Sequence, residues 1–259
     1  MKTFKKDELN VRVFETRESM GEAAATEVSH TIAKVLKEKE YVNIIFASAP
    51  SQNEFLATLK EKDVEWNRVN AFHMDEYVGL APDAPQGFGT FLKERLFKFF
   101  DFRSINYING SHVDAEQECE RYADLLKRFP TDIVILGIGE NTHLAFNDPH
   151  VAFFDDPKIV KVVDMDETTR KQQVNDGSFP TLDNVPVFAI TITIPTLFNA
   201  TYAYAICPGS QKASAIEHTL NSEIGEAYPS TILRRHENAV LFIDVKSASR
   251  VKLPSSLSN

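Results

Sequence analysis

With 259 residues, of which 43% are hydrophobic and 25% charged, the chain has an ordinary globular composition and can bury a sizeable core. Its net charge of −9 argues against nucleic acid and anionic membrane surfaces as partners, because either would need a basic face. The first ten residues contain no signal-peptide core, and no apolar run approaches the ~18 residues of a membrane span. We therefore expect a cytoplasmic protein that binds a small molecule.

Hydrophobic periodicity predicts helices and strands that alternate along the chain. Between residues 18 and 39, apolar side chains recur at steps of three and four, as in an amphipathic helix. Helices are predicted at residues 18–39, 53–59, 91–100, 115–129 and 213–220, and strands at 41–46, 69–74, 105–108, 133–136, 159–163, 187–194, 201–207 and 239–243.

No repeat, low-complexity linker or break in composition divides the chain. Strands that alternate with helices indicate a parallel sheet. We therefore predict a single α/β domain over residues 1–259, with a polar tail at about residues 250–259. Its core would be one doubly wound, mostly parallel sheet with helices on both faces, in a Rossmann-like arrangement.

The predicted strand 133–136 is followed by GIGENTHLAFNDP at residues 137–149, where polar side chains gather. In open α/β sheets, ligands bind at the carboxyl ends of the strands. The glycines would let the backbone turn sharply or lie against a ligand. A surface histidine in an ordinary turn would produce the same spacing, so both interpretations stay open. The polar residues concerned are Asn141, His143, Asn147 and Asp148.

Two other junctions offer groups that suit an anion. Ala47–Gln52 joins a strand to a helix through small residues, and free backbone N–H groups at a helix end favour a phosphate. A plain turn with Ser51 as N-cap fits this spacing equally well. Lys212 lies in the first turn of a predicted helix, where it either is solvated or points into the site.

Asp75 and Glu76 directly follow the strand predicted at 69–74. Adjacent carboxylates are costly to bury and usually cap a helix or face water. If they line the same rim as His143, one of them could act as a base. His73 lies inside the strand and is interpreted as a packed residue, and the loop 78–89 is long enough to cover a site.

Four segments together resemble one known family. FHMDEYVG at residues 72–79 is similar to that family's Met-Asp-Glu-Tyr segment, and residues 137–149 to its Gly-x-Gly-x-Asp-Gly-His-Ile-Ala-Phe-Asn-Glu-Pro signature. GSQK at residues 209–212 matches the family, and PSTIL at residues 229–233 is similar to its Pro-Ala-Ser-Ile-Leu segment. Over about residues 10–245 the chain thus resembles the glucosamine-6-phosphate isomerase/deaminase family.

The resemblance implies an enzyme that opens the ring of an amino sugar phosphate, moves a proton between C2 and C1, and releases ammonia. By this resemblance Asp75 is the general base and His143 the ring-opening acid/base, while Asn141 and Asp148 stand where the family has two carboxylates that assist the histidine. Histidine titrates near neutral pH, and one carboxylate can serve both carbons, so no metal or other cofactor is expected. The implied substrate-binding residues are Ser48, Ala49, Ser51, Gln52, Glu76, Gly139, Arg170 and Lys212.

The chain departs from the family pattern in ways that bear on its substrate. Asn141 can orient an imidazole but cannot stabilise its charge, and Asp148 is one methylene shorter than the family's glutamate. The phosphate loop lacks glycines, and the arginine that the family has shortly after Thr169-Arg170 is absent, so Arg170 is a candidate substitute.

These departures leave several functions open. The substrate would be glucosamine 6-phosphate, galactosamine 6-phosphate, another amino sugar phosphate or a sugar without a 6-phosphate. The alternatives are a 6-phosphogluconolactonase-type hydrolase and a sugar-phosphate-binding regulator that has lost its chemistry. Homo-oligomers are common in the family, and the resemblance allows one here.

Overall fold

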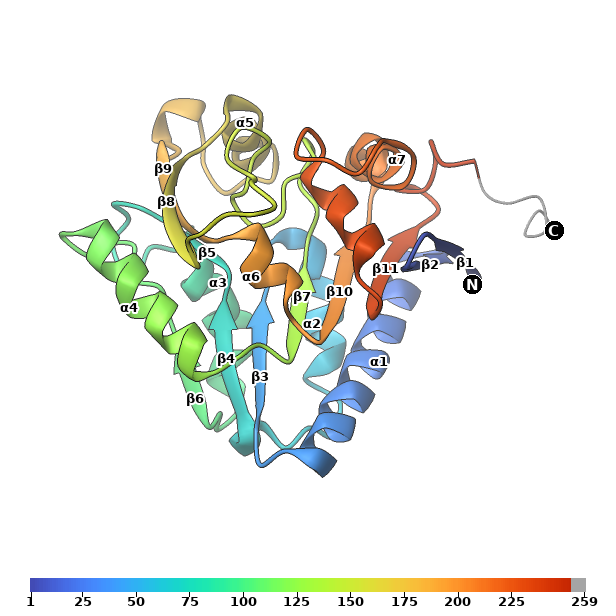
Figure 1. Ribbon diagram of the computed structural model, residues 1–259, viewed down its shortest axis with the longest axis horizontal. Coiled ribbons are helices and arrows are strands. Elements are labelled where there is room, and N and C mark those ends of the chain that lie inside the picture. The colour runs from blue at the N-terminus through green and yellow to red at the C-terminus, as the bar shows by residue number, and fades with distance from the viewer. Residues whose placement is uncertain (253–259) are drawn as a thin grey trace.

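The computed structural model describes residues 1–252 and contains two sheets (Figure 1). The main sheet has eight strands in the order β1-β2-β11-β10-β7-β3-β4-β6, and the second has three in the order β5-β9-β8. The strands are β1 (Lys2–Lys6), β2 (Leu9–Phe14), β3 (Val42–Phe46), β4 (Val69–His73), β5 (Asp75–Tyr77), β6 (Ser104–Asn106), β7 (Ile133–Leu136), β8 (Val160–Asp164), β9 (Phe188–Ile192), β10 (Tyr202–Cys207) and β11 (Ala239–Asp244).

The main sheet is parallel except for the β1–β2 hairpin. From β3 the chain adds β4 and β6 toward one edge, then returns to β7 on the other side of β3 and continues to β10 and β11. The strand order therefore reverses between β3 and β7, and crevices at such reversals bind ligands. The carboxyl ends of these strands lie at the upper edge of the sheet in Figure 1, below α5.

Helices cover both faces of the main sheet, and Figure 1 shows α4 and α6 in front of it and α2 and α3 behind. Successive strand residues face opposite sides, so Ile45 packs in one cluster with α4, α6 and α7, while Ile44 and Phe46 pack in the other with α1, α2 and α3. The helices are α1 (Arg17–Glu38), α2 (Asn53–Leu59), α3 (Phe88–Arg95), α4 (Ala115–Arg128), α5 (Glu167–Asn175), α6 (Ile194–Phe198) and α7 (Ala213–Asn221).

The predicted α/β class, with a mostly parallel sheet and helices on both faces, is confirmed. The structure differs in having a second, antiparallel sheet, because the chain leaves the main sheet after β4 and β5 pairs with β9. The alternating pattern of β9 indicates a strand but does not identify its partner. Part of the predicted polar tail, residues 253–259, lies outside the described residues.

Several elements depart from the sequence prediction, among them α6, which begins at Ile194 where the predicted strand 187–194 ends. The hairpin of β1 and β2 was not predicted, because the exposed edge strand β1 consists mostly of polar residues. The polar helix α5 lacks an apolar stripe and is started by Asp166, whose carboxylate accepts a hydrogen bond from Thr168 N at 2.7 Å. α3 begins and ends earlier than the predicted 91–100, since Leu96 leaves the helical region at φ −140°.

Within residues 1–252, none of the helices combines the length and apolarity needed to cross a lipid bilayer.

Candidate active site

A cavity of about 410 Å³ opens at the carboxyl edge of the main sheet. The loops after β3 and β7, the β4–β5 junction, α3, α5 and Lys212 all contribute to its wall. Asp75 and His143 both line it, so the two residues expected to perform proton transfer face one space. The other sequence-predicted residues in its wall are Ser48, Ala49, Ser51, Gly139 and Lys212.

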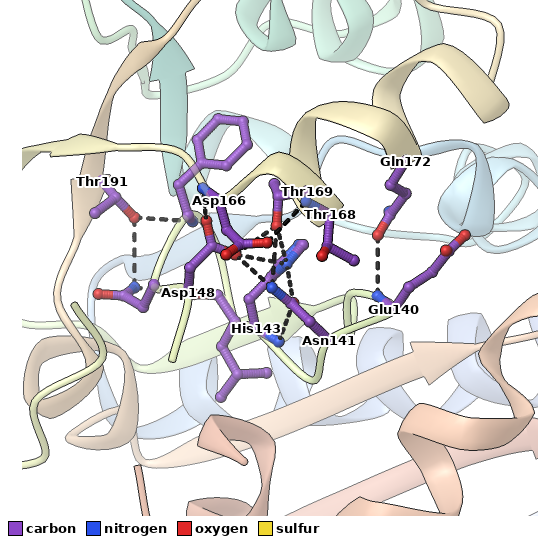
Figure 2. A network of polar contacts seen from close by, with 12 residues as sticks. Glu140, Asn141, His143, Asp148, Asp166, Thr168, Thr169, Gln172 and Thr191 are labelled. Carbon is purple, nitrogen blue, oxygen red and sulfur yellow. Dashed lines mark hydrogen bonds and ion pairs between the residues drawn. The ribbon is translucent and has the colours of Figure 1, made fainter. Parts of the chain in front are cut away.

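His143 is held in one orientation by the amide of Asn141 (Figure 2). Nδ1 of His143 lies 2.7 Å from Asn141 Oδ1, which can only accept, so we assign the ring proton to Nδ1. Asn141 Nδ2 donates to Asp148 Oδ1 at 2.9 Å, which fixes the amide orientation. Within the described residues no hydrogen bond engages Nε2 of His143, and this nitrogen is therefore available to a ligand.

Gly139 makes room for the imidazole. A Cβ at this position would overlap the ring of His143, so only glycine permits the observed orientation. The backbone strengthens the same turn, because Gly139 N donates to His143 O at 3.0 Å. The predicted close approach at this glycine is thus explained by a side chain of the protein itself.

Asp148 lies fully buried behind His143, with Oδ1 at 3.2 Å from Nδ1 of His143. Its carboxylate also accepts from Asp166 N at 2.8 Å and from the Thr169 hydroxyl. Burial alone would raise the pKa of Asp148, but the hydrogen bond and charge of His143, with Asn141 and Thr169, lower it well below its usual range. Asp148 therefore remains ionised and supplies the negative charge that Asn141 lacks.

Asp75 is buried at the start of β5. Burial, and secondarily the neighbouring charge of Glu76, raises its pKa well above the ordinary aspartate value. The imidazole of His73 stabilises the backbone at this point, since Nδ1 lies 2.9 Å from Asp75 O while Nε2 accepts from Ile108 N at 2.9 Å. Burial lowers the pKa of His73 to about 4, which agrees with its predicted role as a packed residue.

Glu76 is not brought into this cavity. Its carboxylate accepts hydrogen bonds from Tyr77 N at 3.0 Å, Phe88 N at 3.1 Å and Gly89 N at 2.9 Å, so it caps the start of α3. It lines a second cavity of about 470 Å³ on the other side of β5. Burial raises the pKa of Glu76, and these hydrogen bonds oppose the shift.

The loop after β3 presents Ser48, Ala49 and Ser51 to the first cavity. The Ser48 hydroxyl is buried and has no hydrogen-bond partner within the described residues. Gln52 is fully buried beneath the loop, where Nε2 donates to Ser51 Oγ at 3.0 Å and to Ile206 O at 3.2 Å. We infer that Gln52 supports the loop from below, since it does not line the cavity.

Lys212 lines the same cavity and is only 6% exposed. Burial lowers its pKa, while Cys207, Asp176 and Glu140 act in the opposite direction. Arg170 is directed elsewhere, because its Nη2 donates to Leu182 O at 2.9 Å and Val185 O at 3.0 Å.

Sequence reasoning missed the residues that α5 contributes to the cavity. Gln172 Oε1 accepts from Glu140 N at 2.9 Å, and Gln173 Oε1 accepts from the Tyr77 hydroxyl at 2.7 Å. Asp176 follows them in the same wall. The Thr169-Arg170 pair pointed to this segment as part of the site. The helix itself was not predicted, because its apolar residues do not recur at helical spacing. Arg95 of α3 was missed as well, because it follows no motif.

Among the described residues, no three histidine, cysteine, aspartate or glutamate side chains are grouped as metal ligands would be.

Known proteins resemble this chain over most of its length. A family model of glucosamine-6-phosphate isomerases/6-phosphogluconolactonase matches residues 15–242. Glucosamine-6-phosphate deaminases from Bacillus cereus (strain B4264) and Bacillus thuringiensis (strain Al Hakam) are each 33% identical over 241 residues, which cover 93% of this chain and 88% of theirs.

Solved structures are similar over nearly the whole chain. A monomeric glucosamine-6-phosphate deaminase matches with a TM-score of 0.85 at 30% identity, covering 93% of this chain and 99% of its own. A 6-phosphogluconolactonase from Thermotoga maritima matches with a TM-score of 0.74 at 21% identity, covering 90% and 98%, which shows a shared fold.

Proposed function

Because the chain belongs to the family of glucosamine-6-phosphate isomerases and 6-phosphogluconolactonases, we propose that this enzyme isomerises and deaminates an amino sugar phosphate, yielding a ketohexose 6-phosphate and ammonia. The observation that carries the proposal is that Asp75 and His143 line one cavity. A base and an acid/base that face the same space can act on neighbouring atoms of one substrate.

Ring opening is assigned to Nε2 of His143. The hydrogen bond from Nδ1 to Asn141 Oδ1 leaves the Nε2 lone pair free to take the proton of the anomeric hydroxyl and return it to the ring oxygen. The imidazolium formed in between is stabilised by the carboxylate of Asp148, 3.2 Å from Nδ1. In a catalytic triad, one carboxylate both orients the histidine and stabilises its positive charge. Here Asn141 orients the imidazole of His143, and Asp148 stabilises its charge.

Proton transfer between the carbons is assigned to Asp75. The raised pKa makes its carboxylate a stronger base than an exposed aspartate, and a substrate ammonium group nearby would favour the ionised form. Asp75 then takes the proton from C2 of the open-chain aldehyde and gives it to C1. The resulting ketose imine reacts with water, and ammonia leaves.

The substrate phosphate is assigned to the loop of Ser48, Ala49 and Ser51 together with Lys212. The buried, unpartnered Ser48 hydroxyl and the small side chains suit an anion bound close to the backbone. The choice between glucosamine and galactosamine 6-phosphate belongs to this proposal, as does the cytoplasmic location expected from the sequence. We propose glucosamine 6-phosphate first, because the relatives at 33% identity carry that name.

The test is to incubate the protein with glucosamine 6-phosphate and galactosamine 6-phosphate and to follow ammonia and ketose phosphate separately. Equal amounts of both products from either sugar support the proposal. Neither product, together with measurable binding, supports the regulator. Rapid hydrolysis of 6-phosphogluconolactone without ammonia release supports the hydrolase, whose solved relative from Thermotoga maritima is 21% identical.

A further inference from the structure

Arg95 is a cavity-lining residue that belongs to none of the motifs. It lies in the last turn of α3. Its Nε donates to Oδ1 of Asn53, the first residue of α2, at 2.8 Å, and its guanidinium carbon lies 3.8 Å from the centre of the Phe91 ring. These contacts engage one edge and one face of the planar guanidinium. Among the described residues no hydrogen bond engages Nη1 or Nη2, so both can donate to a ligand.

Among the described residues, no carboxylate lies at ion-pair distance from Arg95. The ion pairs found within residues 1–252 involve neither Arg95 nor Lys212. Two cations without a carboxylate at ion-pair distance thus line one cavity of a protein whose net charge is −9. A buried or half-buried cation is stabilised by a counter-charge, which a bound anion would supply here.

Asn53, the hydrogen-bond partner of Arg95, belongs to the same chain segment as the cavity-lining residues Ser48 and Ser51. The loop of these serines leads directly into α2, and Asn53 is its first helical residue. The unpartnered Ser48 hydroxyl lines the cavity beside this junction. A guanidinium fork, a hydroxyl and the ammonium group of Lys212 together match a phosphate dianion, whose oxygens accept several hydrogen bonds each.

We propose that Arg95 binds the terminal phosphate of the substrate, in place of the arginine absent after Arg170. The inference rests on the proposed function for the identity of the sugar, but its phosphate contact stands on the cavity alone. Asp75 lines the same cavity, so we expect the substrate to bind with its amino group near Asp75 and its phosphate near Arg95. A substrate without a phosphate would leave both cations unpaired.

The test measures binding of inorganic phosphate, fructose 6-phosphate and fructose to the intact protein by calorimetry. Arg95→Ala is expected to weaken binding of both phosphate-containing probes by about 10- to 100-fold, because it removes a charge-assisted hydrogen-bond pair. Arg95→Lys should recover part of the loss, and binding of fructose should not change. Lys93→Ala is the matched control, since Lys93 is an exposed cation on the same helix that lines only the second cavity, and it should change binding less than about twofold.

Each outcome decides one point. Phosphate binding that is equal in the wild type and in Arg95→Ala overturns the inference, as does an absence of phosphate binding in the wild type. Binding that depends on Arg95, without ammonia release from any amino sugar phosphate, supports the inference and refutes the deaminase. Should Arg95→Ala melt at a lower temperature, Asn53→Ala frees the guanidinium while retaining it, and a smaller loss of phosphate affinity is then expected.

Discussion

Replacing Gly139 with alanine should remove most of the catalytic activity and leave the fold intact. A Cβ at Gly139 would overlap Nδ1, Cε1 and Nε2 of His143. Gly139 is not among the residues with positive φ, so alanine would not strain the backbone. The conflict is therefore confined to the imidazole, which has to leave its position.

The expected size of the effect follows from that displacement. To reach an ordinary contact of ~3.5 Å the ring would have to move by more than ~1 Å. This breaks the 2.7 Å hydrogen bond from Nδ1 to Asn141 Oδ1. A misplacement of ~1 Å costs about 10²-fold, and a positioned acid/base contributes about 10²–10⁴-fold. We expect kcat for deamination to fall by about 10²–10⁴-fold, equivalent to about 3–5 kcal/mol in the activation barrier.

The assay follows ammonia release at saturating substrate, with circular dichroism melting and phosphate binding as controls. Gly137→Ala is the matched variant, because its Cβ would lie at ordinary contact distances, 3.6 Å from Ser51 Oγ and 3.7 Å from Gln52 Nε2. It should retain kcat within about threefold, as is usual for a substitution without a clash. A Gly139→Ala protein with wild-type kcat would refute the assignment of ring opening to His143 in this orientation.

Three further variants test the other roles. Asp75→Asn should suppress exchange of the C2 proton with solvent while phosphate binding persists, and undiminished exchange would contradict its role as the base. Because the pKa of Asp148 is lowered, its carboxylate stabilises the fold above the unfolded pKa of about 4 and loses that effect as pH falls through the folded value. Asp148→Asn should therefore reduce the free energy of unfolding by about 1–3 kcal/mol at pH 7 and by less at pH 3, measured by urea denaturation; equal losses would count against this. Lys212→Ala should raise KM about tenfold. Because burial lowers the Lys212 pKa, its ammonium group loses its proton, and wild-type KM rises, at a lower pH than for an exposed lysine with a pKa of about 10.4. An unchanged KM in the variant would contradict a role for Lys212 in substrate binding.

Much of the fold could be predicted because its signals are local. Buried parallel strands are continuous apolar runs, as in Ile133–Leu136, and the helix predicted at residues 53–59 coincides with α2. The polar rim after β7 was also predictable, because glycines and polar groups directly follow an apolar strand. A parallel sheet brings the ends of β4 and β7 to one edge, so Asp75 and His143 could be expected to meet.

Side-chain direction could not be predicted in the same way. Asp75 and Glu76 are adjacent carboxylates, but successive residues of β5 face opposite sides, so one lines the first cavity and the other caps α3. Arg170 carries the charge that a phosphate needs, yet two backbone carbonyls turn it away. Arg95 is held at the cavity by Asn53, which the packing of α2 beside α3 brings to it.

The sequence by itself determined the α/β class, the order of the loops at the carboxyl edge and the pair of residues, Asp75 and His143, that line one cavity there. All of these depend on residues close together in the chain or on the general geometry of parallel sheets. Only the tertiary structure decided which cations remain unpaired, which carboxylate stays ionised behind His143 and which strands form the second sheet. Those outcomes depend on partners from distant segments, and the burial and hydrogen bonds that set them exist only once the segments have packed.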